Sequence, residues 1–154
     1  MTDKEGTVGG PVAGIASDTK RILRSLKIFQ GLDDRELVDV ISQSKKLECK
    51  AGTMVIQEGA EGSALFVILA GHAQVLKRRD EIQRPIQELG PGECFGEMSL
   101  LDRRTRSASV RAIQDCKLLQ ISREQIERFP SVAAKMYRNI AVMLSLRIRA
   151  RIQL

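Results

Sequence analysis

The chain has 154 residues, of which 43% are apolar, and a net charge of +6. This size and composition suit one ordinary domain with its own hydrophobic core, and they exclude collagen-like and wholly disordered chains. Aromatic residues make up only 3% of the chain, too few for the stacking surfaces that bind single-stranded nucleic acid. The longest uncharged run, residues 62–76, is shorter than the roughly 20 apolar residues of a transmembrane helix. We therefore expect no transmembrane segment.

Cysteine and histidine are too few and too widely spaced for a metal site or a disulfide framework. The three cysteines, Cys49, Cys94 and Cys116, fit no zinc or redox spacing, and His72 is the one histidine. The N-terminus lacks the basic and apolar regions of a signal peptide. These features predict free thiols in a reducing, cytoplasmic compartment and no bound metal.

The sequence also lacks the motifs of common enzyme classes. It has no nucleophile elbow, no phosphate-binding lysine loop and no histidine cluster of the kind that a metal-dependent phosphodiesterase requires. We expect that the protein is not an enzyme and needs no cofactor.

The N-terminal part of the chain is expected to hold a tail and two helices. Residues 1–16 are rich in glycine and proline and lack periodicity, which predicts a mobile tail. Ser17 can cap a helix whose apolar residues recur at helical spacing and which ends near residues 28–29. A second helix is predicted to begin at Asp33 or Asp34.

The middle of the chain is typical of short strands separated by turn residues. Seven of the twelve glycines fall between residues 52 and 96, where they separate apolar segments at short intervals. The strand candidates are residues 47–50, 53–57, 64–70, 72–78, 83–89, 93–95, 108–113 and 116–121. This pattern predicts an eight-stranded antiparallel β-roll (jelly roll) in a mainly β fold with flanking α-helices.

The C-terminal part is predicted to be helical. Ser122 and Gln125 form a capping box, and Pro130 ends the short helix that follows and opens a long one reaching about residue 152. The apolar surface of the long helix is too wide for one neighbour, so we expect the roll on one side and a second subunit of a homodimer on the other. The expected domain, residues 17–154, has N-terminal helices over 17–46, the roll over 47–122 and C-terminal helices over 123–154.

The end of the chain is strongly basic. Residues 135–154 carry five Lys or Arg residues and no acidic residue. Cations at this end of a helix face the negative pole of the helix dipole. The alternative is that they contact a partner, such as nucleic acid, acidic lipid or another subunit.

One segment, residues 92–110, carries the chemistry of an anion site. Gly96 allows a close backbone turn, and the helical turn predicted directly after it presents free N–H groups. Arg106 and Ser107 begin the next strand within reach of the same point, and together these donors describe a phosphate cradle. A carboxylate beside such a cradle, that of Glu97, is explained if it accepts hydrogen bonds from hydroxyl groups of the same ligand. A sugar phosphate fits this arrangement.

The segment resembles the phosphate-binding cassette of the cyclic-nucleotide-binding domain family. It carries the family pattern Phe-Gly-Glu, then small or apolar residues, then Arg-Ser-Ala-x-Val, and the resemblance covers roughly residues 20–150. Glu97 and Arg106 are nine residues apart, which is similar to kinase regulatory subunits and channel domains, whereas bacterial catabolite activators usually have ten. The surroundings also match the family at Gly52, Glu58-Gly59, Leu65-Phe66-Val67-Ile68, Gly71 and Leu89-Gly90-Pro91-Gly92.

The resemblance implies a role for each part of the cassette. Arg106 pairs with the cyclic phosphate, and Glu97 accepts a hydrogen bond from the ribose 2′-hydroxyl. Ser107 and the backbone N–H groups of Ser99 and Ala108 assist at the phosphate. The Gly96 carbonyl or the Met98 N–H lies near the ribose.

Two further groups of residues follow from the same resemblance. The base pocket is expected to be lined by Val75, Ile86 and Gln87. The lid is expected on the C-terminal helix, near Leu144, Arg147 and Ile148.

The family implies a sensor or regulatory module that binds a cyclic nucleotide and signals through movement of its C-terminal helix. Because Ser107 resembles the residue of bacterial cyclic AMP receptors, we expect cyclic AMP rather than cyclic GMP. The alternatives are a dimerisation or docking module with a vestigial pocket, and a truncated regulator like the catabolite activators. Homologous transcription factors carry a DNA-binding domain after the long helix, and because this chain stops at Leu154 we expect no direct DNA binding.

Overall fold

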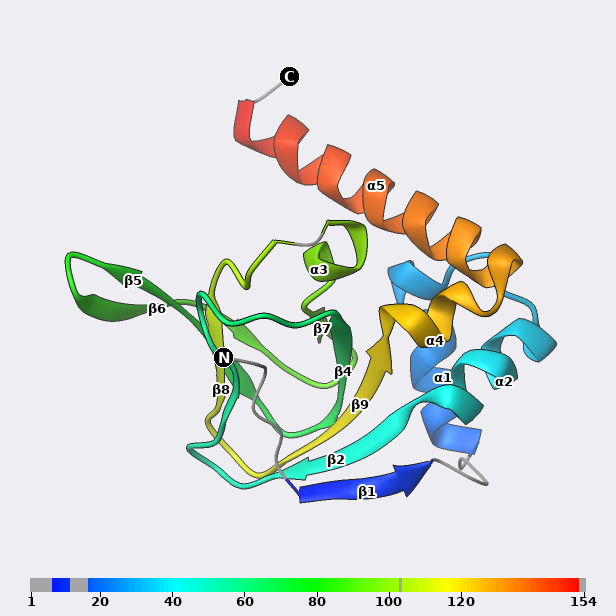
Figure 1. Ribbon diagram of the computed structural model, residues 1–154, viewed down its shortest axis with the longest axis horizontal. Coiled ribbons are helices and arrows are strands. Elements are labelled where there is room, and N and C mark those ends of the chain that lie inside the picture. Colours follow the sequence, from blue (N-terminus) through cyan, green and yellow to red (C-terminus); the bar gives the residue numbers. More distant parts are fainter. Residues whose placement is uncertain (1–6, 12–16, 103, 153–154) are drawn as a thin grey trace.

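The structure, a computed structural model, describes residues 7–11, 17–102 and 104–152 (Figure 1). The helices are α1 (Ser17–Ser25), the 3₁₀ helix η1 (Lys27–Phe29), α2 (Asp34–Gln43), α3 (Met98–Leu101), α4 (Arg123–Glu127) and α5 (Pro130–Ile152). The strands are β1 (Thr7–Pro11), β2 (Lys45–Cys49), β3 (Met54–Ile56), β4 (Ala64–Ala70), β5 (Ala73–Arg79), β6 (Ile82–Leu89), β7 (Cys94–Phe95), β8 (Ser109–Ala112) and β9 (Cys116–Ser122).

The strands form two facing sheets. One has the order β1-β2-β9-β4-β7 and the other β3-β8-β5-β6, and every pairing among the described strands is antiparallel. Strands β2 to β9 are the eight strands of the predicted roll, so the predicted fold class is confirmed. Apolar side chains fill the space between the sheets, and the rings of Phe66 and Phe95 stack there with centroids 5.1 Å apart.

Strand β1 corrects the prediction for the N-terminus. Thr7–Pro11 was expected to belong to a mobile tail, but it pairs with the edge of β2, with an irregular register between Val8 and Pro11. A glycine- and proline-rich segment has weak strand propensity, and Pro cannot donate to a ladder, which restricts such a segment to a sheet edge. The rest of the predicted tail, residues 1–6 and 12–16, lies outside the described residues.

The predicted starts of the second helix and of the short helix after the roll are confirmed. Asp33 and Glu36 form a capping box at α2, and Ser122 and Gln125 form another at α4. The first helix ends earlier than predicted, at Ser25, because the backbone of the next residue is extended. Residues 27–29 then continue as a 3₁₀ turn.

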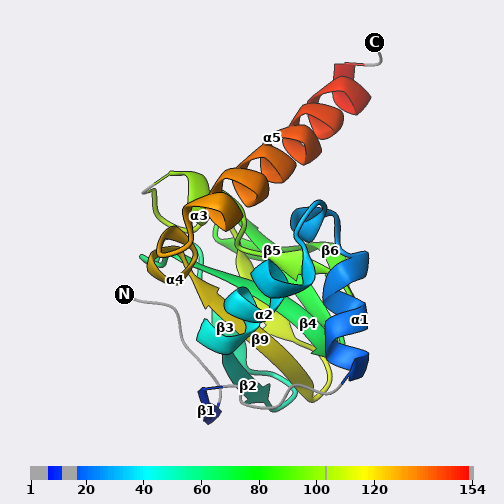
Figure 2. The ribbon, with the colours of Figure 1, turned by 90° about the vertical axis from the view of Figure 1, so that its right-hand side faces the viewer.

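A helical layer covers the outer face of the five-stranded sheet (Figure 2). Along β4, Leu65 and Val67 face the helices whereas Phe66 and Ile68 face the other sheet, and β9 alternates in the same way. Both faces of β4 are therefore buried, which explains its continuous apolar sequence, whereas β9 interrupts its apolar residues with Lys117 and Gln120. The N-terminal half of α5 belongs to this layer, and its C-terminal half extends beyond it. None of the helices that the structure describes is long and apolar enough to cross a membrane.

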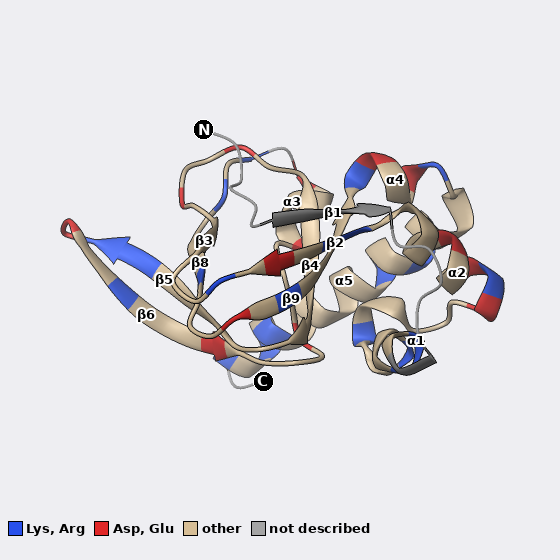
Figure 3. Ribbon diagram, turned by 90° about the horizontal axis from the view of Figure 1, so that it is seen from below, with Lys and Arg blue, Asp and Glu red and all other residues tan. Residues whose placement is uncertain are grey.

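Strands β5 and β6 project from the body as a hairpin (Figure 1). Its turn residues, Asp80 and Glu81, both have positive φ, as a tight hairpin turn requires. Figure 3 shows the Lys and Arg residues along this hairpin. Exposed charged side chains protect an edge of this kind from pairing with other chains.

Glu36 connects α2 to α5. Its carboxylate accepts hydrogen bonds from the Ser131 hydroxyl at 2.9 Å, from Lys135 Nζ at 2.5 Å and from the Asp33 N–H at 3.1 Å. These donors, that of Lys135 above all, lower the pKa of Glu36 from 4.5 to about 2. Asn139 connects α5 to η1 as well, since its side-chain amide donates to the carbonyls of Ile28 and Gln30.

Glu36→Gln is expected to lower the free energy of unfolding at neutral pH. Because folding lowers the pKa of Glu36, its contribution is complete above pH 4.5 and is lost as the pH falls toward 2. Urea denaturation at several pH values should therefore show the variant and the wild type converging over this range. Glu61→Gln removes an exposed carboxyl group and serves as the control. A difference that does not change with pH would contradict the assignment.

Candidate functional site

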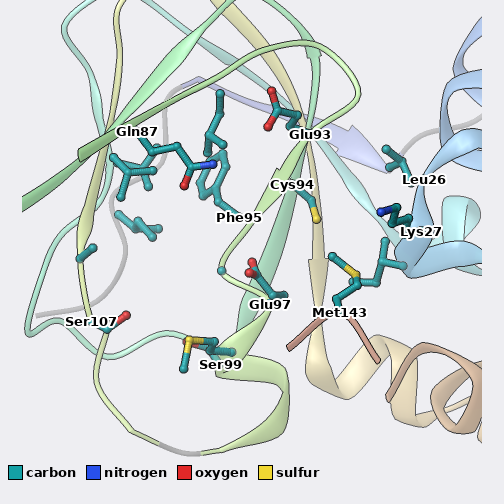
Figure 4. A pocket seen from close by; sticks show the side chains of 18 of the residues that line it. Leu26, Lys27, Gln87, Glu93, Cys94, Phe95, Glu97, Ser99, Ser107 and Met143 are labelled. Atoms are coloured by element: carbon teal, nitrogen blue, oxygen red, sulfur yellow. The ribbon is translucent and has the colours of Figure 1, made fainter. Parts of the chain in front are cut away.

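A cavity of about 480 Å³ opens between the roll and α5 (Figure 4). It is lined by residues from β3, β5, β6, β7 and β8, from the cassette, and from the start of η1 and one face of α5. Its volume lies within the range of small-molecule sites. The cassette residues therefore share one concave space with β5 and β6, the strands on which a base pocket is expected from the sequence.

Arg106 is the buried cation of this site. Only 3% of the residue is exposed, and its guanidinium donates to the Ala64 carbonyl at 2.9 Å and to the Gly96 carbonyl at 3.4 Å. Its backbone is held as well, by hydrogen bonds with Gly59 and Ala60. A guanidinium fixed in this way beside a cavity favours an anion there, because its positive charge is already in place.

Gly96 makes this position of Arg106 geometrically feasible. Its φ is +86°, and a Cβ atom there would lie 2.7 Å from the Ala64 carbonyl oxygen and 3.0 Å from Arg106 Nη1. The close approach therefore requires glycine on two grounds, the left-handed backbone and the lack of space.

The short helix α3 follows Gly96 and is held from outside. Inside the turn, the Ser99 N–H donates to the Gly96 carbonyl at 3.2 Å. At its other end, the guanidinium of the buried Arg123 donates to the Ser99 carbonyl and, at 2.6 Å, to the Asp102 carbonyl. A four-residue helix has little stability of its own, so Arg123 positions it.

Arg123 was missed by the reasoning from the sequence. The available signal was its place directly after the N-cap Ser122, where a cation faces the positive end of the helix dipole and is disfavoured. A cation at such a position indicates that it has another structural role, which here is to hold α3.

Glu97 lines the cavity and contacts α5. Arg147 Nη1 donates to Glu97 Oε1 at 3.1 Å, and the Glu97 side chain is 12% exposed. In Figure 4 its carboxylate is directed into the space lined by Phe95 and Ser99. The side-chain oxygens of Glu97 can accept further hydrogen bonds from hydroxyl groups.

The structure brings together most of the residues proposed for the site from the sequence. Those that line the cavity are Val75, Gln87, Gly96, Glu97, Met98, Ser99, Arg106, Ser107, Ala108 and Arg147. The cavity lining also includes residues that were not proposed for the site from the sequence: Leu26, Lys27, Leu89, Phe95 and Met143. Of these, Met143 could have been found, because it lies one helical turn before Arg147.

Three residues proposed from the sequence lie outside the cavity lining. Ile86 is 61% exposed because the register of β5 and β6 shifts between the pairs Val75–Gln87 and Leu76–Pro85, which leaves Ile86 as the extra residue of a bulge. On α5, Leu144 packs against the helical core and Ile148 is 61% exposed. The helix presents Met143 and Arg147 to the cavity instead.

Cys94 also lines the cavity, at the entry to the cassette. Burial raises the pKa of its thiol to about 12, so it is protonated at neutral pH and lacks the reactivity of a thiolate.

No group of three or more potential metal-ligating His, Cys, Asp or Glu side chains occurs in the described part of the chain.

The fold and site define a cyclic-nucleotide-binding domain. The family model described as the cyclic nucleotide-binding domain matches residues 46–131, more than half of the chain. The chain belongs to this family.

Relatives in the family include regulators from bacteria and fungi. The chain is 34% identical to a cyclic AMP receptor protein of Thermus thermophilus, over 82% of this chain and 59% of that protein. It is 32% identical to a cAMP-dependent protein kinase regulatory subunit of Aspergillus fumigatus, over 70% of this chain and 24% of the relative. The chain thus spans less than two thirds of the length of these curated relatives.

Solved structures show the same fold. The catabolite activator protein of Thermus thermophilus superposes with a TM-score of 0.74 at 32% identity, covering 81% of this chain and 59% of that chain. The regulatory domain of Toxoplasma gondii PKA, crystallised with cAMP, gives a TM-score of 0.69 at 32% identity, covering 72% and 42%. A domain from Methylobacillus flagellatus gives 0.80 at 23% identity, covering 94% and 84%, which supports the fold alone.

Gly96→Ala is expected to destabilise the domain more than Gly52→Ala does. Both residues have positive φ, which costs about 1–3 kcal/mol for a residue with a side chain. A Cβ at Gly52 meets nothing within 4 Å, whereas one at Gly96 meets the Ala64 carbonyl and the Arg106 guanidinium. Free energies of unfolding from urea titrations measure the difference, and equal losses would show that the close approach is unimportant.

Proposed function

We propose that this domain is a cyclic-nucleotide sensor that binds cyclic AMP in the cavity between the roll and α5. The observation that carries the proposal is the convergence of a buried guanidinium, Arg106, and a carboxylate, Glu97, on one cavity of about 480 Å³. A cyclic nucleotide presents a phosphate anion and a ribose hydroxyl, and these two groups require a cation and an acceptor in this arrangement.

Each ligand group has a proposed set of contacts. Arg106 pairs with the cyclic phosphate, helped by the Ser107 hydroxyl and the Ala108 N–H. The Ser99 N–H already donates to the Gly96 carbonyl, so a contact with the phosphate would have to share it. Glu97 accepts from the 2′-hydroxyl, and Gln87 and Val75 contact the base.

The choice of cyclic AMP over cyclic GMP rests on the relatives and on Ser107. The relatives just described are named as a cyclic AMP receptor and as a regulatory subunit of a cAMP-dependent kinase. Serine after the cassette arginine is similar to bacterial cyclic AMP receptors. These observations support a regulatory, non-enzymatic module.

The output is proposed to pass through α5. The buried residues of this helix lie in its N-terminal half, between Val132 and Ile140, whereas Met143 and Arg147 reach the cavity. Ligand binding can therefore change the packing of the C-terminal half while the first half stays anchored. Exposed apolar side chains in the outer half, including Leu146 and Ile152, support the proposal that a homodimer forms through this helix.

Two further properties of the domain are proposed, one for its mode of action and one for its location. The regulator is proposed to act without contacting DNA itself, through its own α5. A reducing, cytoplasmic location is supported by the three free thiols, of Cys49, Cys94 and Cys116.

Arg106→Ala is expected to weaken cyclic AMP binding by about thirtyfold to several thousandfold, because losing one partner of a buried charge pair costs about 2–5 kcal/mol. Arg106→Lys should recover only part of this loss, since an ammonium group cannot form the two-pronged contact. Isothermal titration calorimetry measures the affinities, and circular dichroism checks that each variant folds.

Arg104→Ala is the matched control, because Arg104 is exposed and the variant loses the same charge. It should change the affinity by less than about threefold. Equal losses for Arg104→Ala and Arg106→Ala would show that general basicity attracts the ligand. Cyclic GMP binding at least tenfold tighter than cyclic AMP would overturn the proposed ligand, and binding of neither would overturn the proposed function.

A further inference from the structure

The Glu97 carboxylate has two oxygens with different surroundings. Oε1 accepts the hydrogen bond from Arg147 Nη1 at 3.1 Å. Among the described residues, no other hydrogen bond reaches this carboxylate. Oε2 is therefore available to a ligand while Oε1 is held by α5.

The Arg147 contact is also the outermost polar connection of α5. Within the described part of the chain, no other side chain of α5 beyond Asn139 makes a hydrogen bond or ion pair with another element. The residues on either side of Arg147, Leu146 and Ile148, are 54% and 61% exposed. Their packing adds little to hold this part of the helix, so the ion pair ties it to the cavity.

We infer that Arg147 is a positioning residue for ribose recognition, which acts on Glu97 and makes no contact with the ligand. This inference rests on the proposed function, in which Glu97 accepts the ribose 2′-hydroxyl. Arg147 holds the Glu97 side chain in one orientation and so aims Oε2 at the ligand. A hydroxyl bound to Oε2 in turn fixes the carboxylate that Arg147 contacts. The two events stabilise each other, as coupled binding requires.

Three possible roles of Arg147 predict different effects of its loss on binding. A lid residue would contact the base or phosphate directly, and its loss would weaken the binding of all cyclic nucleotides alike. A residue that competes with the ligand for the Glu97 carboxylate would have to be displaced by the ribose, and its loss would strengthen binding. A positioning residue affects only ligands that carry the 2′-hydroxyl, because its effect passes through Glu97.

The test compares cyclic AMP with 2′-deoxy cyclic AMP, by calorimetry at low salt. The wild type should prefer cyclic AMP by about tenfold or more, the cost of losing a hydrogen bond to a charged group. Arg147→Ala should reduce this preference by about two- to fivefold, as expected for a partly exposed ion pair, and should leave the affinity for the deoxy ligand unchanged. Arg147→Lys should restore part of the preference. Arg149→Ala, two residues along α5 with the same loss of charge, should have no effect.

A second measurement needs no ligand. Arg147→Ala and Glu97→Gln should each accelerate hydrogen exchange of the amides of residues 144–152, and the double variant should exchange no faster than either one. Unchanged exchange in both single variants would overturn the tie between α5 and the cavity.

The outcomes also separate this inference from the proposed function. The positioning role would be overturned, while the sensor function stands, if Arg147→Ala weakened the binding of cyclic AMP and of 2′-deoxy cyclic AMP equally. It would also be overturned if Arg147→Ala bound cyclic AMP more tightly than the wild type does. If the wild type bound neither nucleotide, the proposed function would fail, and the coupling to ribose recognition would fail with it.

Discussion

The buried guanidinium of Arg106 is the constraint on which the rest of the site depends. A charged group inside a protein is costly unless polar groups surround it, and here the carbonyls of Ala64 and Gly96 supply part of that surrounding. These carbonyls come from the start of β4 and the end of β7, so placing one side chain fixes the relation between two strands. It also fixes the identity of Gly96, since any side chain would collide with both groups.

Local chemistry in the sequence was sufficient to predict most of the fold. Alternating and continuous apolar segments, separated by glycines, located all eight strands of the roll to within about two residues. Side-chain to backbone pairing over three residues located the starts of α2 and α4, because a capping box is complete within its own segment. The cassette was predicted for the same reason, since its residues lie within one short stretch of chain.

The features that the sequence did not predict depend on contacts between distant segments. The position of Ile86 depends on how β6 pairs with β5, and a one-residue bulge beside Pro85 turns it away from the cavity. The role of Arg123 depends on the carbonyls of α3, more than twenty residues earlier. On α5, a helical pattern alone could not decide which of several apolar and basic residues faces the roll. These are choices of register and phase, which local sequence determines weakly.

The two-sided burial of β4 and β9 has a consequence for how the domain responds to heat and to ligand. Each strand gives alternate side chains to the core inside the roll and to the core beneath the helices. Neither core can lose its packing alone, because both cores depend on the same two strands, β4 and β9, staying in place. The domain should therefore behave as one cooperative unit. A ligand bound in the cavity would therefore stabilise both cores together, because binding to the folded state stabilises the whole cooperative unit.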